Sequence, residues 1–229
     1  MKTYLWQITA KTNLHVGNEN STSYGIIDKA VQRDVLTGLP CINSSSLKGA
    51  VNEFCCSTGM SEADRIRIFG GDKKGKNQDS RKGAAIFYDA SLLYLPVQDD
   101  DRLFVYATSK AVKAALAGRL GLFGQSVAAE SFLRVDNREV KELENKKFSD
   151  LCSDENLPII ARNILDNGQS KNLWYEQVVP SETVFYAIIQ EPDGVLAKTI
   201  DGRLIQIGAN ATIGYGYCKF NLIAEYDEN

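Results

Sequence analysis

Both ends of the chain are β-prone, and helical and extended segments alternate between them. Residues 4–10 alternate along a strand, with Tyr4, Trp6 and Ile8 on one face. Residues 217–223 have a similar β-prone character. This pattern predicts that the first and last segments are both strands of one sheet.

The segments between these ends predict two helices and further strands. The serines at 44–46 precede Leu47, Val51 and Phe54, whose spacing places them on one helical face, and a serine is well suited to cap such a helix. The other expected elements, in chain order, are strands at 84–97 and 104–107 and an alanine-rich helix at 110–120. Strand, helix, two strands, helix and strand fit a ferredoxin-like (RRM-like) α+β fold, whose open sheet face can bind RNA.

Chain length and hydropathy predict one domain with no membrane-spanning segment. A chain of 229 residues can bury one good core, so we expect a single domain over 1–229 with insertions at about 70–83 and 135–180. No run approaches the roughly 20 apolar residues that a membrane helix needs. The first ten residues alternate in polarity, unlike a signal peptide. We therefore expect a cytoplasmic protein with no membrane partner.

Charge and cysteine content restrict the possible functions without deciding between them. A net charge of −3 argues against a free-standing nucleic-acid binder, although positive charge gathers locally at 73–82 and acid at 99–101. The five cysteines are an odd number, none are at the spacing of a zinc knuckle, and the chain has one histidine. We expect these cysteines to be small buried or half-buried residues without a disulfide framework.

Asp28 is the strongest candidate for a catalytic residue. It lies in a polar loop beside Lys29 and Arg33, and a carboxylate next to cations can hold a metal ion or a water near a phosphodiester. The alternative is that Asp28 caps a turn or pairs with one of these two cations. Local sequence leaves both interpretations open.

Two further stretches have the character of phosphate-binding sites. Ser45 and Ser46 begin the predicted helix, whose free N–H groups attract phosphate, and Lys48 adds a positive charge there. The glycine-rich segment 208–216 would allow a polyanion to approach the backbone closely. A serine cap with a solvated lysine, and a plain hairpin turn, are the alternatives for the two stretches.

Together these stretches resemble the RAMP superfamily of CRISPR proteins. In that family an N-terminal loop, a serine and lysine helix start and a C-terminal glycine-rich loop occur in this order. Residues 25–33, 37–40 and 45–49 look most like the backbone subunit of the type III-B Cmr complex, and 82–90 and 173–180 are similar to further segments.

The resemblance implies a RAMP fold with inserted loops and a thumb-like β-hairpin, in a subunit that serves antiviral defence. It implies binding to a CRISPR guide RNA, to further copies of the chain in a filament and to other Cmr effector subunits. Asp28 would support cleavage of complementary target RNA with a divalent cation, magnesium or manganese. The implied RNA-binding residues are Lys48, Ser45, Ser46, Arg33, Gly208, Asn210, Gly214 and Gly216, and the implied thumb residues are Trp174, Tyr175 and Val178.

The sequence departs from the family pattern at two points. Ser44 stands where relatives usually have a glycine, and Asp28, Lys29 and Ala30 replace an aliphatic-Asp-x-Pro pattern.

The single histidine, His15, is a second candidate for a general base, but its position after the first strand favours a hydrogen-bonded structural residue. Three alternatives remain: a guide-binding scaffold without cutting activity, the equivalent Csm subunit, and a small-molecule enzyme on the same fold.

Overall fold

The computed structural model describes residues 1–17, 27–71, 82–125 and 138–227, which form a mixed α/β protein built on one large sheet. Six elements form the core of this fold. They are β1 (Lys2–Ala10), α1 (Ser44–Ser57), β4 (Ala90–Val97), β9 (Val184–Glu191), α6 (Val195–Ile200) and β11 (Tyr217–Tyr226). The strands lie in the order β11-β1-β9-β4 and every neighbouring pair is antiparallel. This is the order of a ferredoxin-like fold, so the predicted α+β class is confirmed.

Shorter strands extend the sheet at both edges. β10 (Leu204–Gln206) pairs with β11, while β5 (Val105–Ser109) and β6 (Val140–Leu143) continue the sheet beyond β4. β5 and β6 are parallel. The expected strand at 84–97 divides into β3 (Ile86–Phe87), which pairs with β9, and β4, which also pairs with β2 (Cys41–Ile42).

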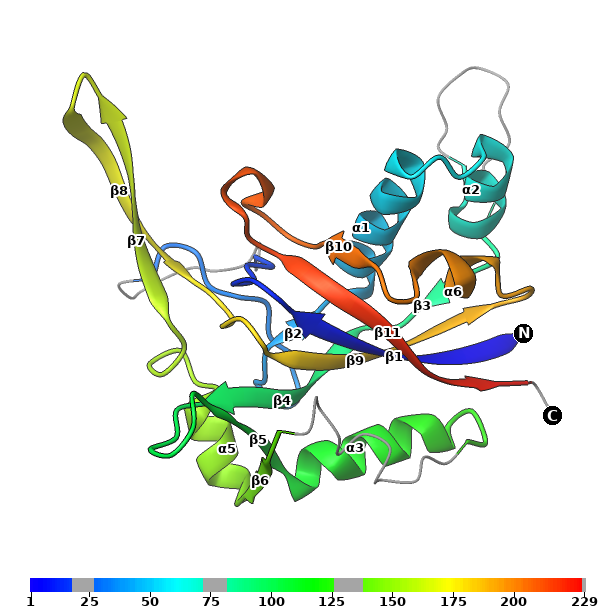
Figure 1. Ribbon diagram of the computed structural model, residues 1–229, viewed down its shortest axis with the longest axis horizontal. Coiled ribbons are helices and arrows are strands. Elements are labelled where there is room, and N and C mark those ends of the chain that lie inside the picture. Colours follow the sequence, from blue (N-terminus) through cyan, green and yellow to red (C-terminus); the bar gives the residue numbers. More distant parts are fainter. Residues whose placement is uncertain (18–26, 72–81, 126–137, 228–229) are drawn as a thin grey trace.

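Helices lie on both faces of the sheet (Figure 1). One face carries α1, α2 (Glu62–Phe69) and α6, and the other carries α3 (Lys110–Gly121) and α5 (Asn145–Leu151). Along β1, Tyr4, Trp6 and Ile8 point to one face and Leu5 points to the other, and all four are at most 1% exposed. The open sheet face that we expected is therefore covered at β1. Helix α3, which belongs to the long segment between β4 and β9, buries Val112, Leu116 and Leu120 and packs against β4 and β5.

A two-stranded hairpin projects from the body of the molecule (Figure 1). It consists of β7 (Ile159–Asp166) and β8 (Gln169–Gln177), which form a two-stranded antiparallel sheet of their own. Asn167 and Gly168 connect them with φ values of 50° and 81°, as a two-residue turn of type I′ requires. The hairpin has the shape expected of the thumb, and its last two residues, Glu176 and Gln177, are buried where it joins the body.

The first turn of α1 differs from the prediction. Asn43 precedes the helix and neither it nor a serine caps it through a side chain. Instead, the Ser44 backbone N–H donates to Oδ1 of Asp89 at 2.6 Å. The predicted serine cap is wrong: the carboxylate of Asp89, just before β4, binds the first free N–H of the helix instead.

Sequence reasoning also missed several short elements. Helix α2 begins after Ser61, whose hydroxyl accepts from the Asp64 N–H, and α6 and β10 were not expected. Four cysteines are buried, whereas Cys56 is exposed on α1, contrary to expectation. No helix in the described parts of the chain is long and apolar enough to cross a membrane.

Candidate nucleic-acid interface

Asp28 lies against the foot of the hairpin. The N–H groups of Asp28 and Lys29 both donate to the carbonyl of Tyr175, at 3.0 and 3.1 Å, and the Gln177 N–H donates to the carbonyl of Lys29 at 2.9 Å. The Tyr175 N–H returns a hydrogen bond to Oδ2 of Asp28 at 2.7 Å. The segment therefore runs alongside β8, and Asp28 is fixed to the hairpin by its backbone and by one carboxylate oxygen. Residues 25–26 of the aspartate loop lie outside the described residues.

The side chain of Asp28 is exposed and keeps one oxygen free for chemistry. Within the described residues, Oδ1 has no hydrogen bond and the carboxylate forms no ion pair with Lys29 or Arg33. Arg33 instead donates through Nε to Asp154 and through Nη1 to the carbonyls of Gly38 and Cys152. The guanidinium of Arg33 is thus occupied in joining segments of the protein, which leaves it fewer donors for RNA.

A buried carboxylate connects the hairpin to the glycine-rich loop. Glu176 is 1% exposed, and its Oε1 accepts from Nδ2 of Asn210 at 2.5 Å. His15 is 3% exposed; its Nδ1 lies 2.7 Å from the carbonyl of Gln177 and 3.5 Å from Oε1 of Glu176. His15 is therefore buried and hydrogen-bonded, as expected. Three separate segments of the chain meet at this point.

The glycines of the 208–216 loop serve different purposes. A Cβ on Gly208 would lie 2.3 Å from the carbonyl oxygen of His15, and one on Gly216 would lie 2.0 Å from that of Ile207. Both glycines therefore allow the loop to pack on the backbone of the protein itself. Gly214 has a φ of +85° and open space around it, so it is the glycine of these three at which another molecule could approach. The side chain of Asn210 is already occupied by Glu176.

The remaining predicted residues lie on α1 and on the hairpin. Ser45 is exposed, while Ser46 and Lys48 are half-buried in the first turns of α1. Because Asp89 already binds the first N–H of this helix, its negative charge weakens the attraction for phosphate there. Trp174 and Tyr175 lie on β8, whereas Val178 follows β8 and is fully buried.

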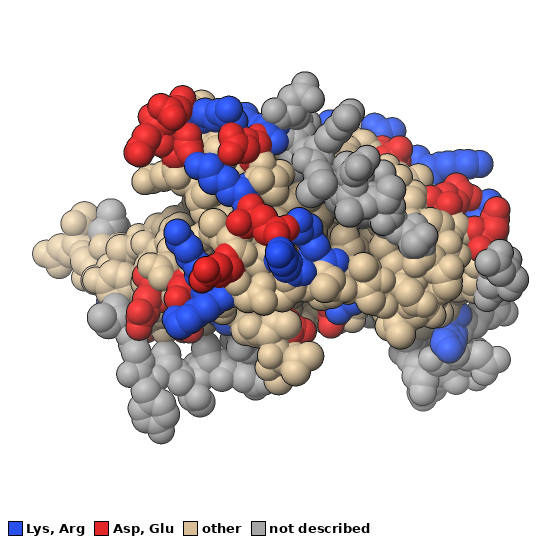
Figure 2. Space-filling model, turned by 90° about the horizontal axis from the view of Figure 1, so that it is seen from below, with Lys and Arg blue, Asp and Glu red and all other residues tan. Residues whose placement is uncertain are grey.

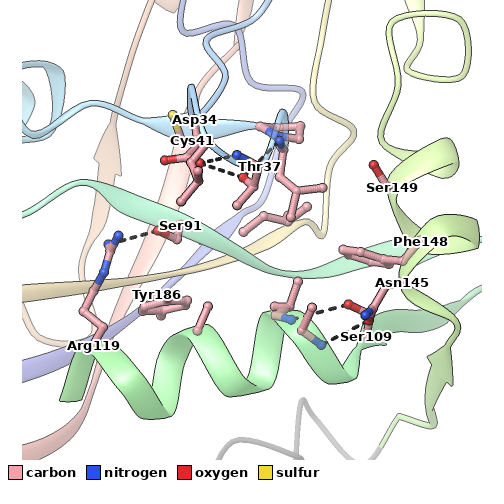
Figure 3. Close-up of a pocket in the computed structure, with 17 residues that line it drawn as sticks. Asp34, Thr37, Cys41, Ser91, Ser109, Arg119, Asn145, Phe148, Ser149 and Tyr186 are labelled. Atoms are coloured by element: carbon pink, nitrogen blue, oxygen red, sulfur yellow. Dashed lines mark hydrogen bonds between the residues drawn. The ribbon is translucent and has the colours of Figure 1, made fainter. Parts of the chain in front are cut away.

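A cavity of about 330 Å³ lies away from these residues, between the turn at 34–40 and helices α3 and α5 (Figure 3). Its lining is largely apolar and includes Tyr186 and Phe148, while Arg119 donates to the hydroxyl of Ser91. Lys, Arg, Asp and Glu are interspersed on the face formed by these helices (Figure 2). This face therefore lacks the concentrated positive charge that a polyanion requires.

The described residues contain no group of three or more His, Cys, Asp or Glu side chains that could hold a metal ion. Asp28 by itself offers one carboxylate, of which one oxygen already accepts from Tyr175. This donor set fits a cation shared with RNA oxygens and water, as magnesium often is, and does not fit an ion enclosed by the protein.

The structural class of this chain is defined by its ferredoxin-like core and by the hairpin that projects from it. At the foot of the hairpin lie an aspartate loop and a glycine-rich loop. A family model described as the RAMP superfamily matches residues 7–219, and the chain belongs to that superfamily.

Individual relatives agree with this membership. The CRISPR system Cmr endoribonuclease Cmr4 of Pyrococcus furiosus is 25% identical over 288 residues, which cover 97% of this chain and 96% of the relative. The cryo-EM structure of the type III-B Cmr-beta complex bound to cognate target RNA contains a chain with a TM-score of 0.74 and 20% identity, covering 96% of this chain and 97% of that one. The crystal structure of oligomeric Cmr4 from Pyrococcus furiosus gives a TM-score of 0.69 and 22% identity, with 97% and 98% covered.

Several residues at the site were not foreseen. The contact of Glu176 with Asn210 was not foreseen because the two residues are distant in sequence. The same holds for Arg162 and Tyr215: Cζ of Arg162 lies over the Tyr215 ring, 5.6 Å from its centre, and the strand β7 that carries Arg162 was not predicted. The lysines at 73–76, in the expected insertion at 70–83, lie outside the described residues.

Proposed function

We propose that this chain is the backbone subunit of a type III-B Cmr effector complex, in antiviral defence. In this role it binds the guide RNA, further copies of itself and other Cmr subunits, and it cleaves complementary target RNA. The whole-length similarity to the Cmr4 endoribonuclease supports the assignment. The observation that carries it is the exposed carboxylate of Asp28, held at the hairpin foot with one oxygen free among the described residues.

Asp28 has the position and chemistry of a general base for cleavage by the 2′-hydroxyl of the target RNA. Its free oxygen accepts the 2′-hydroxyl proton while the 2′-oxygen attacks the adjacent phosphorus. The bond from phosphorus to the 5′-oxygen then breaks, giving a 2′,3′-cyclic phosphate and a 5′-hydroxyl that takes a proton from water. The hydrogen bond from Tyr175 fixes the orientation of the carboxylate during this step.

The other acid-base candidate does not reach the solvent. His15 is buried and its Nδ1 is held by the carbonyl of Gln177, so it supports the hairpin foot and does not contact RNA. A magnesium or manganese ion shared between Asp28 and RNA oxygens would neutralise negative charge on the phosphate. Removing divalent cations with EDTA should then stop cleavage, and adding either ion back should restore it.

The decisive experiment compares wild type with Asp28→Asn in a complex assembled with guide RNA and the neighbouring effector subunits. We expect regularly spaced products from a complementary RNA, with a cleavage rate at least about 100-fold lower in the variant. Target binding, measured by gel shift, should be retained. Asp150→Asn is the matched control, because it alters an exposed carboxylate on α5 that is paired with Lys146 and forms no contact with the aspartate loop among the described residues.

Unchanged cleavage by Asp28→Asn would contradict this assignment. The chain would then be a guide-binding scaffold, and the nuclease would be another subunit. Loss of both target binding and cleavage would instead indicate that the substitution disrupts the hairpin foot.

A further inference from the structure

Two cations beside the aspartate loop each lie against an aromatic ring. Nζ of Lys29 is 5.2 Å from the centre of the Trp174 ring, and Cζ of Arg162 is 5.6 Å from that of Tyr215. Arg162 and Trp174 are direct partners in the pairing of β7 with β8, so their side chains share one face of the hairpin. Lys29, Trp174, Arg162 and Tyr215 thus form a row, which we call the cation–aromatic strip.

The strip joins the two loops assigned to RNA. Lys29 follows Asp28 directly, and hydrogen bonds to Tyr175 and Gln177 fix its backbone on both sides. Tyr215 lies between Gly214 and Gly216 in the glycine-rich loop. A strand of RNA that passes over the strip would therefore reach Asp28 at one end and the open space at Gly214 at the other.

The two cations of the strip keep their N–H donors available. Among the described residues the side chain of Lys29 forms no ion pair, and Arg162 forms a long one with the buried Glu176, whose Oε2 lies 3.8 Å from its Nε and beyond hydrogen-bond distance. Other cations are paired closely, as Lys141 is with Asp99 at 2.6 Å. The side chain of Arg162 is 20% exposed, and its planar N–H donors match the oxygens of a phosphate.

Two buried atoms in or beside the strip also lack hydrogen-bond partners among the described residues. Nε1 of Trp174 and Oε2 of Glu176 have no hydrogen bond within the described part of the chain. Leaving a buried donor or acceptor unpaired costs free energy, so such atoms often mark a place where a ligand belongs. A ribose or phosphate oxygen would satisfy the indole N–H.

We propose that the cation–aromatic strip binds the backbone of single-stranded RNA, with Lys29 and Arg162 each contacting a phosphate and the two rings holding these cations in place. This inference rests on the proposed function and names the residues that bring the strand to Asp28. Aromatic rings and cations in alternation are suited to single strands, because rings stack on any base and phosphate contacts are independent of sequence.

The test is the salt dependence of RNA binding by the full-length chain. Binding of a short fluorescent oligouridine is measured over a series of KCl concentrations, in an Asp28→Asn background so that no RNA is cut. Each lost phosphate contact should lower the slope of log K against log salt by about 0.7. We expect this change for Lys29→Ala and for Arg162→Ala, each with about tenfold weaker binding.

Three further variants control this experiment. Lys171→Ala removes a cation on the same hairpin that is paired with Asp166, and should leave the slope unchanged. Arg162→Lys keeps the charge and should restore the slope. Trp174→Leu should weaken binding without changing the slope, because the ring positions Lys29 but carries no charge.

Slopes equal to that of the parent chain for both Lys29→Ala and Arg162→Ala would overturn the proposal, as would an equal loss in Lys171→Ala. Thermal melting of each variant separates a lost contact from a lost fold. Because binding is measured without cleavage, this result is independent of whether Asp28 cuts RNA. Absence of RNA binding in the parent chain and all variants would count against the proposed function itself.

Discussion

Asp28 and the backbone of Tyr175 are joined by two hydrogen bonds in opposite directions. The Asp28 N–H donates to the Tyr175 carbonyl, and the Tyr175 N–H donates to Oδ2 of Asp28. The carboxylate assigned to catalysis is therefore also a structural part of the hairpin foot. A movement of the hairpin would move Asp28 with it. Substitutions at Asp28 should consequently change both the rate of RNA cleavage and the stability of the fold, and different substitutions should change the two to different degrees.

The first prediction compares Asp28→Asn with Asp28→Ala. Asparagine keeps an acceptor for the Tyr175 N–H, whereas alanine removes it, so we expect alanine to be less stable by about 1 kcal/mol. For a chain of this length this difference lowers the Tm by about 2–4 °C. Both variants should lose cleavage. Equal melting temperatures for the two would mean that the hydrogen bond contributes nothing to folding.

The second prediction concerns the glycine-rich loop. Gly216→Ala would place a Cβ 2.0 Å from the carbonyl oxygen of Ile207, so the backbone must shift, and we expect a loss above about 2 kcal/mol. Gly214→Ala is the matched control, because it meets no atom within 4 Å and bears only the strain of its positive φ, about 1 kcal/mol. Urea denaturation followed by tryptophan fluorescence measures both. The reverse order of stability would contradict the packing at Gly216.

The third prediction concerns the buried carboxylate of Glu176. Glu176→Ala leaves the amide of Asn210 without its acceptor and should destabilise the chain by about 2–3 kcal/mol. Glu176→Gln keeps an acceptor for Asn210 and should lose less than half as much. The comparison is made by denaturation, with protease cleavage of the hairpin as a local probe. If glutamine were as damaging as alanine, the negative charge would matter more than the hydrogen bond.

The parts of the fold with a local signal could be predicted from the sequence. The strand at Tyr4 to Ala10 and the helix at Lys110 to Leu120 appear where their patterns place them. The hairpin also carried a usable signal, because Asn167 and Gly168 form the dipeptide most typical of a two-residue turn. We placed Trp174 and Tyr175 in the thumb from resemblance alone and did not predict its first strand.

The contacts that build the site could not be predicted, because they join residues far apart in the chain. Asp89 replaces a serine cap at Ser44 from 45 positions away, and Asn210 reaches Glu176 across 34. Local secondary-structure propensity does not predict such partners. The role of Gly216 could not be predicted either. Glycine is favoured both in a turn and where the chain approaches another backbone closely, as Gly216 approaches Ile207, so the sequence does not distinguish the two.

The last prediction concerns pH. Glu191 is 1% exposed and accepts hydrogen bonds from Leu196 and Ala197 at the start of α6. Burial raises the pKa of this carboxyl above its usual value, although these hydrogen bonds oppose the shift. The folded state then holds the proton more tightly than the unfolded state does. The stability contributed by Glu191 is therefore present below its ordinary pKa and is lost as the pH rises towards the folded value.

Glu191→Gln removes this titration, so the stability of wild type relative to the variant should fall as the pH rises from about 4 towards neutrality. Asp64→Asn is a control of opposite sign, because the hydroxyl of Ser61 lowers the pKa of Asp64. Relative to that variant, wild type should gain stability as the pH rises through the ordinary aspartate range. Urea denaturation at a series of pH values measures both differences. Parallel pH profiles for wild type and Glu191→Gln would show that Glu191 ionises equally in the folded and unfolded chain.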